Sequence, residues 1–467
     1  MYPLLMLREY HGLSRSSNRE EIPMARTFVL ALAFFLVVPV AAPGATLTVG
    51  PSDCSDSAVN DAIEGANSGD TIKLTCKGTA HWSNTVTIPN TKGITLLGPG
   101  SDTPKTFAIF PLAIVLNNNQ GSAIQINCEN NMPLSRVTGL KFRGPASMYP
   151  YIEVLGRGFG AGAGAYRIDN CYFDTIGSEP VILLNGDTGA LTGLVDDCTF
   201  HDCCYDNYDI LVRETYLGSS SSCYGYDSWI RPFTFGSSQF HFIEDCLFES
   251  ITQYNRHYVA CDGAGGRYVV RHCTLHSQLA GTCPDYIDAH GDGTCGLGTG
   301  TRGGEIYGNT FLGTAGTVGR NIAIRGGQFL IYNNTFTTSG YLATPITMDE
   351  YRADVVGASE SCTEVQYPSS CNPTIPQCVT PSDFSQWYPL PGQIRGTYLW
   401  NNLLRGINQS PTVVSNLYVS TYLQANRDFW VSKGKPAALA GYTPYPYPHP
   451  LRHAIITGFP LSQDPIW

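Results

Sequence analysis

The chain has 467 residues, of which 43% are hydrophobic and only 14% are charged, against about 25% charged residues in typical globular proteins. The hydrophobic fraction excludes a disordered chain, and the formal charge of −10 argues against a nucleic-acid-binding protein, which usually carries a basic face. Low charge together with 49 Gly and 27 Tyr suits an extracellular β protein. Because the chain is acidic, it could bind an acidic glycan only through locally placed Arg side chains or a bound cation.

Residues 1–45 are predicted to be an upstream extension followed by a signal peptide, with Met1 or Met24 as the start. Arg26 precedes an apolar run at 28–38, and small residues follow, which is the order of a secretory signal. The run is shorter than the about 20 residues that span a membrane. We therefore expect cleavage near residue 45, no membrane span afterwards, and a secreted or cell-surface location, extracellular or periplasmic.

Residues 57–66 are predicted to form a short helix that caps the N-terminal edge of the fold. Its apolar residues follow the helical spacing i, i+3, i+4, i+7: Val59, Ala62, Ile63 and Ala66. Asp56 or Ser57 is a plausible N-cap, and a strand, TIKL, follows from Thr71.

A six-residue pattern then recurs: aliphatic, any, small polar, Leu/Cys/Asn, any, Phe or Leu. Its copies are VTGLKF from Val137, IDNCYF from Ile168, VDDCTF from Val195, IEDCLF from Ile243, VRHCTL from Val270, IYGNTF from Ile306, IYNNTF from Ile331 and LWNNLL from Leu399. Subtracting successive starts gives intervals of 31, 27, 48, 27, 36, 25 and 68 residues. The shortest is one bare coil of a solenoid, and the longer intervals are the same coil with an inserted loop.

Two columns of side chains should run through this solenoid. The fourth position gives Cys171, Cys198, Cys246, Cys273, Asn309, Asn334 and Asn402, and the sixth gives Phe173, Phe200, Phe248, Phe311 and Phe336. Stacked Asn amides can hydrogen bond to one another, and small buried thiols fill the same space without strain. All 16 cysteines lie beyond the signal, and an even number in an exported chain suggests disulfides, which we expect mainly among Cys362, Cys371 and Cys378. No two CxxC motifs occur, which argues against cysteine-bound zinc.

The fold expected from residues 46–405 is all-β, a single right-handed parallel β-helix. Propeller blades repeat at about 40–50 residues, and short hairpin turns, which an antiparallel sandwich would need, are scarce. The segment AVNDAIEGANSGDTIKL, followed by coils that end in NNTF, resembles the pectate-lyase-like superfamily of right-handed β-helices. The resemblance implies the fold and an asparagine ladder, but that fold hosts lyases, hydrolases, epimerases, esterases and non-enzymatic proteins.

Two long insertions, 214–237 and 350–393, interrupt the coils, and a Pro- and Tyr-rich tail, 406–467, follows them as a predicted C-terminal cap. Long loops on a rigid scaffold often bind ligands. Aromatic side chains in the first insertion could stack on sugars or pack the loop onto the coils: Tyr224, Tyr226 and Trp229.

A second, ionisable column follows from aligning an earlier strand of each coil: ILLNG from Ile182, ILVRE from Ile210, VACDG from Val259, IDAHG from Ile287, AIRGG from Ala323 and TMDEY from Thr347. It contains Asn185, Arg213, Asp262, His290, Arg325 and Glu350, with Asp288 and Asp349 beside it. Ionisable groups stacked this closely are costly unless they pair or bind something. The column is either a mutually paired ladder or a functional site.

Three functions fit an extracellular polysaccharide as partner. A lyase would use His290 or an Arg as the base, Arg213 or Arg325 to grip a uronate carboxylate, and Ca²⁺ on Asp262, Asp288 and Asp349. A glycoside hydrolase would use Asp262 and Asp288 as its paired carboxylates. A non-catalytic glycan-binding protein is the third possibility, and in each case Glu350 and the loop aromatics would contact substrate.

Overall fold

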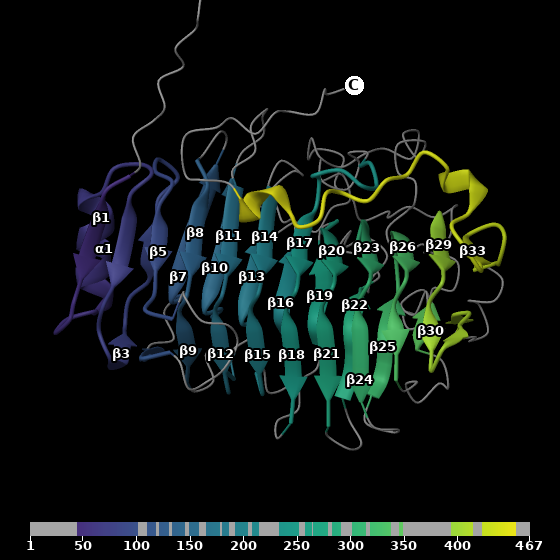
Figure 1. Ribbon diagram of the computed structural model, residues 1–467, viewed down its shortest axis with the longest axis horizontal. Helices are drawn as coiled ribbons and strands as arrows, with labels where there is room; N and C mark the ends of the chain where they lie inside the picture. The colour runs from purple at the N-terminus through teal and green to yellow at the C-terminus, as the bar shows by residue number, and fades with distance from the viewer. Residues whose placement is uncertain are drawn as a thin grey trace, which may run out of the picture. The chain divides into compact units, whose positions relative to one another are not determined.

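The structure is a computed structural model that describes residues 44–100, 110–117, 121–129, 133–144, 149–157, 165–177, 180–185, 192–203, 208–213, 233–251, 257–263, 265–278, 283–290, 301–313, 318–337, 345–348, 394–413 and 423–453. These residues form a right-handed parallel β-helix, as the repeat predicts, with three strands in a typical coil (Figure 1). The signal peptide up to residue 43, most of the insertion 214–237 and all of the insertion 350–393 lie outside the described residues.

The first strand of each coil belongs to a 12-stranded sheet, called sheet A. Its strands are, in order, β1 (Thr46–Val49), β2 (Thr71–Leu74), β5 (Thr95–Leu97), β8 (Ser135–Thr138), β11 (Ala165–Asp169), β14 (Thr192–Asp196), β17 (His241–Glu244), β20 (Arg267–Arg271), β23 (Gly303–Tyr307), β26 (Gln328–Tyr332), β29 (Thr397–Trp400) and β33 (Phe429–Ser432).

The second strand of each coil belongs to the 11-stranded sheet B. Its strands are β3 (Gly78–Trp82), β6 (Leu112–Leu116), β9 (Lys141–Arg143), β12 (Tyr172–Asp174), β15 (Thr199–His201), β18 (Leu247–Ser250), β21 (Thr274–Ser277), β24 (Thr310–Gly313), β27 (Thr335–Phe336), β30 (Leu403–Leu404) and β31 (Ile407–Asn408). The β30–β31 pair is antiparallel, whereas the other strand pairs described are parallel.

The third strand of each coil belongs to the 10-stranded sheet C. Its strands are β4 (Val86–Ile88), β7 (Ile124–Glu129), β10 (Ile152–Arg157), β13 (Ile182–Asn185), β16 (Tyr208–Arg213), β19 (His257–Gly263), β22 (Cys283–Ala289), β25 (Val318–Ile324), β28 (Ile346–Met348) and β32 (Thr412–Val413). The two long insertions follow strands of sheet C, since residue 214 comes after β16 and residue 350 comes soon after β28.

The helix α1 (Asp56–Gly65) packs Val59 and Ile63 onto the core near the first coil. Its N-cap is Ser55, one residue upstream of Asp56 and two upstream of Ser57, the predicted caps, because the Ser55 Oγ accepts a hydrogen bond from the Ala58 amide at 3.3 Å. Asp56 instead accepts from the backbone of Ser83 at 2.8 Å, which ties the helix to the turn before β4. A disulfide between Cys54 and Cys76, which the sequence did not single out, joins the segments on either side of the helix.

The recurring six-residue pattern is the turn from sheet A to sheet B. Its third position adopts positive φ in successive coils, which short polar residues and Gly tolerate best: Asn170, Asp197, Asp245, His272, Gly308, Asn333 and Asn401. The fourth position points into the core. There the four predicted cysteines are buried thiols. Asn309 donates from its side-chain amide to the Asn334 oxygen at 3.0 Å, and Asn334 donates in the same way to the Asn402 oxygen at 2.9 Å.

The predicted phenylalanine column is confirmed on the inner side of sheet B. Phe173, Phe200 and Phe248 stack at centroid distances of 4.8 Å, with ring planes 9° and 7° apart. Leu275 takes the next place in register, and Phe311 and Phe336 continue the column at 4.6 Å. The column extends upstream to Phe142, so one core runs through the coils.

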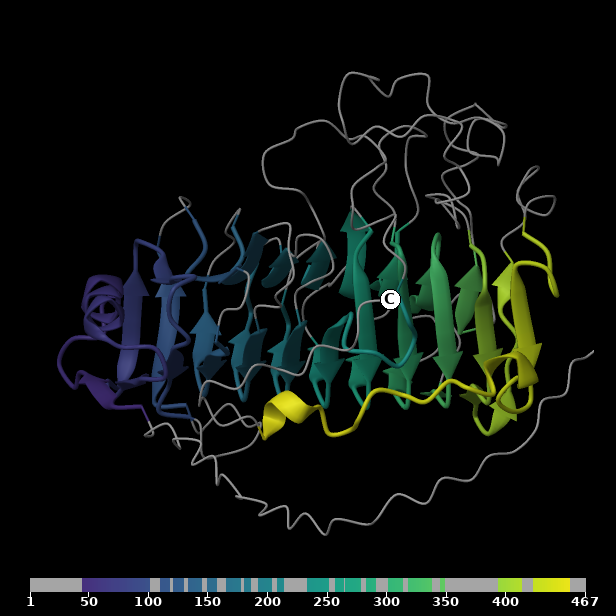
Figure 2. The same ribbon diagram turned by 90° about the horizontal axis from the view of Figure 1, so that it is seen from above.

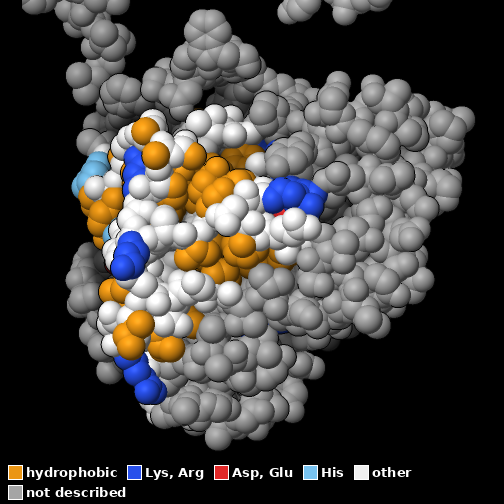
Figure 3. All heavy atoms as spheres, turned by 90° about the vertical axis from the view of Figure 1, so that its right-hand side faces the viewer, with side chains coloured by type: hydrophobic (Ala, Val, Ile, Leu, Met, Phe, Trp, Pro, Cys, Tyr) orange, Lys and Arg blue, Asp and Glu red, His pale blue; other side chains and the backbone are white. Residues whose placement is uncertain are grey.

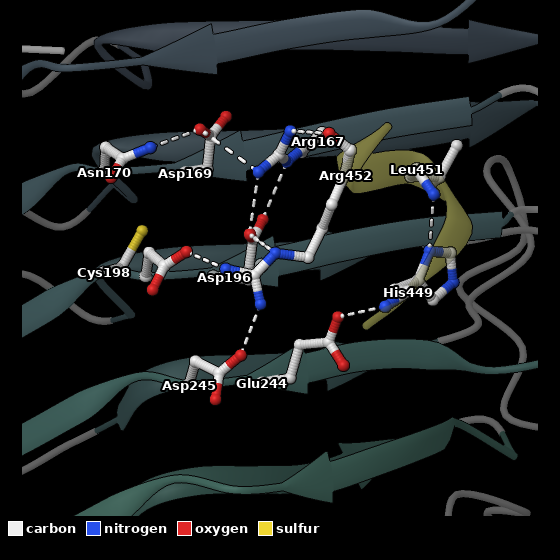
Figure 4. Close-up of polar contacts among 12 residues, drawn as sticks. Arg167, Asp169, Asn170, Asp196, Cys198, Glu244, Asp245, His449, Leu451 and Arg452 are labelled. Atoms are coloured by element: carbon white, nitrogen blue, oxygen red, sulfur yellow. Dashed lines mark hydrogen bonds and ion pairs between the residues drawn. The ribbon is translucent and has the colours of Figure 1, made fainter. Parts of the chain in front are cut away.

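The C-terminal segment 435–453 runs back along the outer face of sheet A (Figure 2). It contains two short 3₁₀ helices, Ala437–Leu439 and Pro450–Arg452. Arg452 contacts Asp196, Asp197 and Asp245, and the Glu244 carboxylate accepts from the His449 amide at 3.0 Å (Figure 4). The predicted tail thus adds β31, β32 and β33 to the sheets and then covers a face of the solenoid.

The end of the solenoid that follows β29 carries hydrophobic side chains in the middle of its described surface (Figure 3). Ile407 in β31 and Val431 in β33 are 68% and 41% exposed. Within the described part of the chain, no helix has the length and hydropathy to cross a membrane.

Candidate functional site

Asp288 is the centre of a polar cluster on the outer face of sheet C. Ile287 and Ala289 on either side of it belong to the core, so the alternation of β22 turns Asp288 outward. Its neighbours in register are Ala260 on β19 and Ala323 on β25. These short side chains leave room above the sheet for larger groups to close over the Asp288 carboxylate, which is fully buried.

Arg325 forms a two-pronged ion pair with Asp288. Its Nε donates to Oδ1 at 2.9 Å, and its Nη2 donates to Oδ2. The register of Ala289 with Ile324 places the next residues, His290 and Arg325, side by side where β22 and β25 end.

Two histidines approach the same Asp288 oxygen. The Nε2 of His290 lies 3.2 Å from Oδ2, and the Nε2 of His257 lies 3.6 Å from it. The two rings are 6.4 Å apart between centroids and nearly perpendicular, at 81°. His257, Asp288, His290 and Arg325 are referred to below as the Asp288 cluster.

The orientation of His257 is fixed from several sides. Its Nδ1 lies 3.1 Å from the backbone oxygen of Asp285, and because a carbonyl oxygen only accepts, Nδ1 carries the donated hydrogen. Tyr208 stacks on the His257 ring at 5.2 Å with planes 13° apart. Asp285 is itself held by Arg320, whose Nε and Nη2 donate to the carboxylate at 2.6 and 2.5 Å.

Electrostatics keep the Asp288 carboxylate ionised. Burial favours its neutral form, but the charges of Arg325, His290 and His257 outweigh burial and hold the pKa of Asp288 below its ordinary value. Burial lowers the pKa of His257, against the opposing effect of Asp288 and Asp285. His290 has the most accessible side chain of the cluster, at 14% exposed against 0% for Asp288, 5% for His257 and 7% for Arg325.

The structure therefore brings together three of the residues that the second column named, Asp288, His290 and Arg325. Arg213 ends β16, two strands away in sheet C, where its register partners are Asn185 and Gly263. The register between β16 and β19 skips Asp262, whose side chain lies outside the described part. Also outside it are Tyr224, Tyr226, Trp229, Asp349 and Glu350.

Sequence reasoning missed His257, Asp285 and Arg320. A signal for them existed, because extending the alignment of VACDG with IDAHG two residues upstream sets His257 opposite Asp285. In the next coil the register is shifted by one residue from the AIRGG alignment, with Ile322 opposite Ile287, and this register sets Asp285 opposite Arg320. The column is thus partly the paired ladder considered above, with ion pairs between adjacent coils, and partly a cluster around one carboxylate.

The described cluster is a poor match for calcium. Ca²⁺ takes six to eight oxygen ligands, whereas this cluster offers one carboxylate, already bonded to Arg325, and two imidazoles. A calcium site would need Asp262 and Asp349, whose side chains are not described, and it stays a prediction.

No protein-family model and no curated protein matches the chain. Among solved structures, an alginate lyase from Paenibacillus sp. str. FPU-7 is 16% identical with a TM-score of 0.39, over 63% of this chain and 96% of that one. The PL6 family alginate lyase AlyGC is 14% identical with a TM-score of 0.27, over 83% of this chain and 53% of that one. At these values neither likeness assigns an activity to this chain, so its function has to be inferred from its own residues.

Proposed function

We propose that this protein is a secreted polysaccharide lyase that cleaves a uronate-containing glycan by β-elimination, with His290 as the base. The observation that carries the proposal is the pairing of the accessible His290 with the buried, ionised Asp288 at 3.2 Å. A carboxylate behind an imidazole fixes its tautomer and orientation and stabilises the imidazolium that forms when the ring accepts a proton.

The tautomer follows from this contact. If the Nε2–H of His290 points at Asp288, the lone pair is on Nδ1, which accepts the proton from the carbon next to the uronate carboxylate. The electron pair of that carbon–hydrogen bond forms a carbon–carbon double bond as the bond to the glycosidic oxygen on the neighbouring carbon breaks, and the departing oxygen takes a proton from solvent water. The Arg325 charge holds Asp288 ionised throughout.

A glycoside hydrolase is less well supported. Its general acid is a carboxylic acid with a raised pKa, and a second carboxylate lies about 5–9.5 Å away. The pKa of Asp288 is lowered instead, and Asp285 is bonded to Arg320 through both oxygens. Neither carboxylate is suited to protonate a leaving group.

Gripping the uronate carboxylate requires a cation on the same face. We assign this role to Arg213, which is half-buried at the end of β16 in the same sheet as the Asp288 cluster. Export follows the signal peptide predicted at the N-terminus, and an extracellular glycan is the corresponding substrate.

The test is turnover of uronate polysaccharides by the wild-type protein and by H290N. Removing a general base costs about 10²–10⁴ in rate, so H290N should lose at least about a hundredfold, while circular dichroism and the unfolding midpoint remain unchanged. H276N is the matched control, because His276 also faces a carboxylate, Glu249 at 3.8 Å, but lies on sheet B. It should keep the wild-type rate.

The product distinguishes the classes. A lyase yields the ultraviolet absorbance of a new double bond. New reducing ends without that absorbance would identify a hydrolase, and binding without turnover would identify a glycan-binding protein. Full turnover by folded H290N would show that another residue is the base.

A further inference from the structure

We propose that His257, Asp288 and His290 form a binding site for a divalent transition-metal ion, for which Zn²⁺ is the probe, and that the bound ion inhibits the enzyme. The metal-binding part stands on the geometry of the Asp288 cluster alone. The inhibitory part rests on the proposed function of His290 as base.

The distances from Asp288 to the two histidines already match the spacing of ligands in a metal site. His257 Nε2, His290 Nε2 and an Asp288 oxygen lie within 4.8 Å of one another. Two ligands on a tetrahedral zinc ion, at about 2.1 Å from it, are roughly 3.4 Å apart. The distances from Asp288 Oδ2 to the two Nε2 atoms, 3.2 and 3.6 Å, bracket that value.

The groups around the ligands are those that metal sites use to orient them. A ligating imidazole usually donates its other N–H to a backbone carbonyl or a carboxylate, and a ligating carboxylate is hydrogen-bonded in turn. His257 donates from Nδ1 to the Asp285 carbonyl, which leaves its Nε2 as the ligand atom in the neutral ring. Asp288 is held by Arg325, and the Tyr208 ring fixes the plane of His257.

The donor set selects the class of ion. Two imidazole nitrogens and one carboxylate oxygen suit zinc and its transition-metal neighbours, whereas calcium and magnesium prefer oxygen ligands. Three protein ligands also leave a fourth position on the ion for water. The positive charge of Arg325 beside the ion weakens binding, so the ion should be removable by a chelator.

Inhibition follows from the tautomer of His290. A metal on Nε2 occupies that nitrogen and leaves the ring hydrogen on Nδ1, so the neutral imidazole has no lone pair left to accept a proton. The same ion cannot bind while Nε2–H points at Asp288. Metal binding and base catalysis therefore exclude each other.

The experiment titrates the metal-free, full-length secreted protein with Zn²⁺ by calorimetry and with Co²⁺ by visible absorption, and measures turnover at each Zn²⁺ concentration. We expect one strong site, a cobalt spectrum without a thiolate charge-transfer band, and inhibition that a chelator reverses. H257Q should weaken binding at least about tenfold and raise the half-inhibiting Zn²⁺ concentration by the same factor, relative to its own zinc-free rate. H276Q, which removes a histidine beside a single carboxylate on sheet B, should bind like the wild type.

The outcomes separate the two proposals. The metal site is overturned if the wild type binds no zinc. It is also overturned if H257Q binds zinc as tightly as the wild type, which is the result expected if cysteines elsewhere held the ion. Binding that depends on His257 but leaves turnover intact supports the site and overturns His290 as the base. If H257Q does not fold, a thiolate band in the wild-type cobalt spectrum overturns the site, and its absence with one strong site supports it.

Discussion

Asp288 is fully buried yet ionised, because Arg325 binds both of its oxygens and two imidazoles face one of them. At the scale of single residues, this carboxylate has two tasks. It neutralises a nearly buried guanidinium, and one of its oxygens faces the Nε2 of His290, the proposed base. A change that removes only its charge tests both.

We expect D288N to lower the free energy of unfolding by about 3–5 kcal/mol, because it leaves Arg325 buried without a counter-ion. Since the pKa of Asp288 is lowered in the folded state, this stabilisation is present above the unfolded value of about 3.9 and is lost as the pH falls through the folded value. Urea unfolding at pH 7 measures the loss. The double variant D288N/R325M should regain part of it, and an unchanged midpoint for D288N would show that Arg325 finds another partner.

The sequence could place Asp288, His290 and Arg325 together because all three follow from strand register, which has a period of two residues. It could not place His257 against Asp288, since that contact crosses from the start of β19 to the end of β22 through the length and direction of two side chains. Spacing along a strand predicts rows of residues, but not diagonal contacts between rows.

The turn from sheet A to sheet B is the element that the sequence specified best. A positive φ at its third position and a small buried group at its fourth recur in coil after coil, and both restrict the residue types that can occupy those positions. Asn334 shows why asparagine is used there. Its amide donates to the Ile306 carbonyl at 2.8 Å and to Asn402 at 2.9 Å, and its oxygen accepts from Asn309 at 3.0 Å.

Truncating this ladder should cost more than truncating the thiol column. N334A removes the acceptor of the Asn309 backbone N–H and side-chain amide, and the donor to the Ile306 carbonyl and to Asn402, on the coils before and after it. Buried polar groups that lose a partner cost about 1–3 kcal/mol each, so we expect a loss of several kcal/mol. C198A, at the same position of another coil, removes only a thiol whose contact with the Ile168 carbonyl is 3.6 Å, and should cost about 1–2 kcal/mol. Thermal unfolding compares the two. Equal losses would mean that the column acts by filling space alone.

The tail could not be placed from the sequence, because its contacts join residues far apart along the chain. Arg271 is fully buried and pairs with Glu244 at 2.6 Å, and it also donates to the backbone oxygens of Tyr445 and Pro446 at 2.7 and 2.8 Å. Tyr442 donates to Glu305 at 2.5 Å. No repeat or spacing in the sequence relates these positions. They come together only in the folded protein, on the outer face of sheet A.

At the scale of the whole molecule, a solenoid is stabilised through contacts between neighbouring coils, which is why one short repeat predicts most of its fold. Some core contacts reach further. The Tyr166 hydroxyl lies 2.7 Å from His241 Nδ1 across the intervening strand β14. Gly193 makes this possible, since a Cβ there would lie 1.8 Å from the Tyr166 ring. Three coils are thereby joined around one buried imidazole.

This imidazole should make the stability of the molecule fall in mild acid. Burial lowers the pKa of His241 from 6.5 to about 4, and that of His449 to about 3. Between pH 6.5 and 4 the unfolded chain therefore binds a proton at His241 that the folded chain does not, and the free energy of unfolding falls as the pH falls. A shift of 2.5 units corresponds to about 3 kcal/mol for His241 at 1.36 kcal/mol per unit.

The measurement is the unfolding free energy of the wild type and of H241F at several pH values between 7.5 and 4. H241F should be less stable than the wild type at pH 7.5, because the Tyr166 hydroxyl loses its partner at a cost of about 1–3 kcal/mol. It should nevertheless lose about 3 kcal/mol less on acidification, so the two curves converge or cross. H276F, which removes a partly exposed histidine, should run parallel to the wild type. If H241F also runs parallel, His241 is protonated in the folded core, and the acid sensitivity belongs to His449 and the tail.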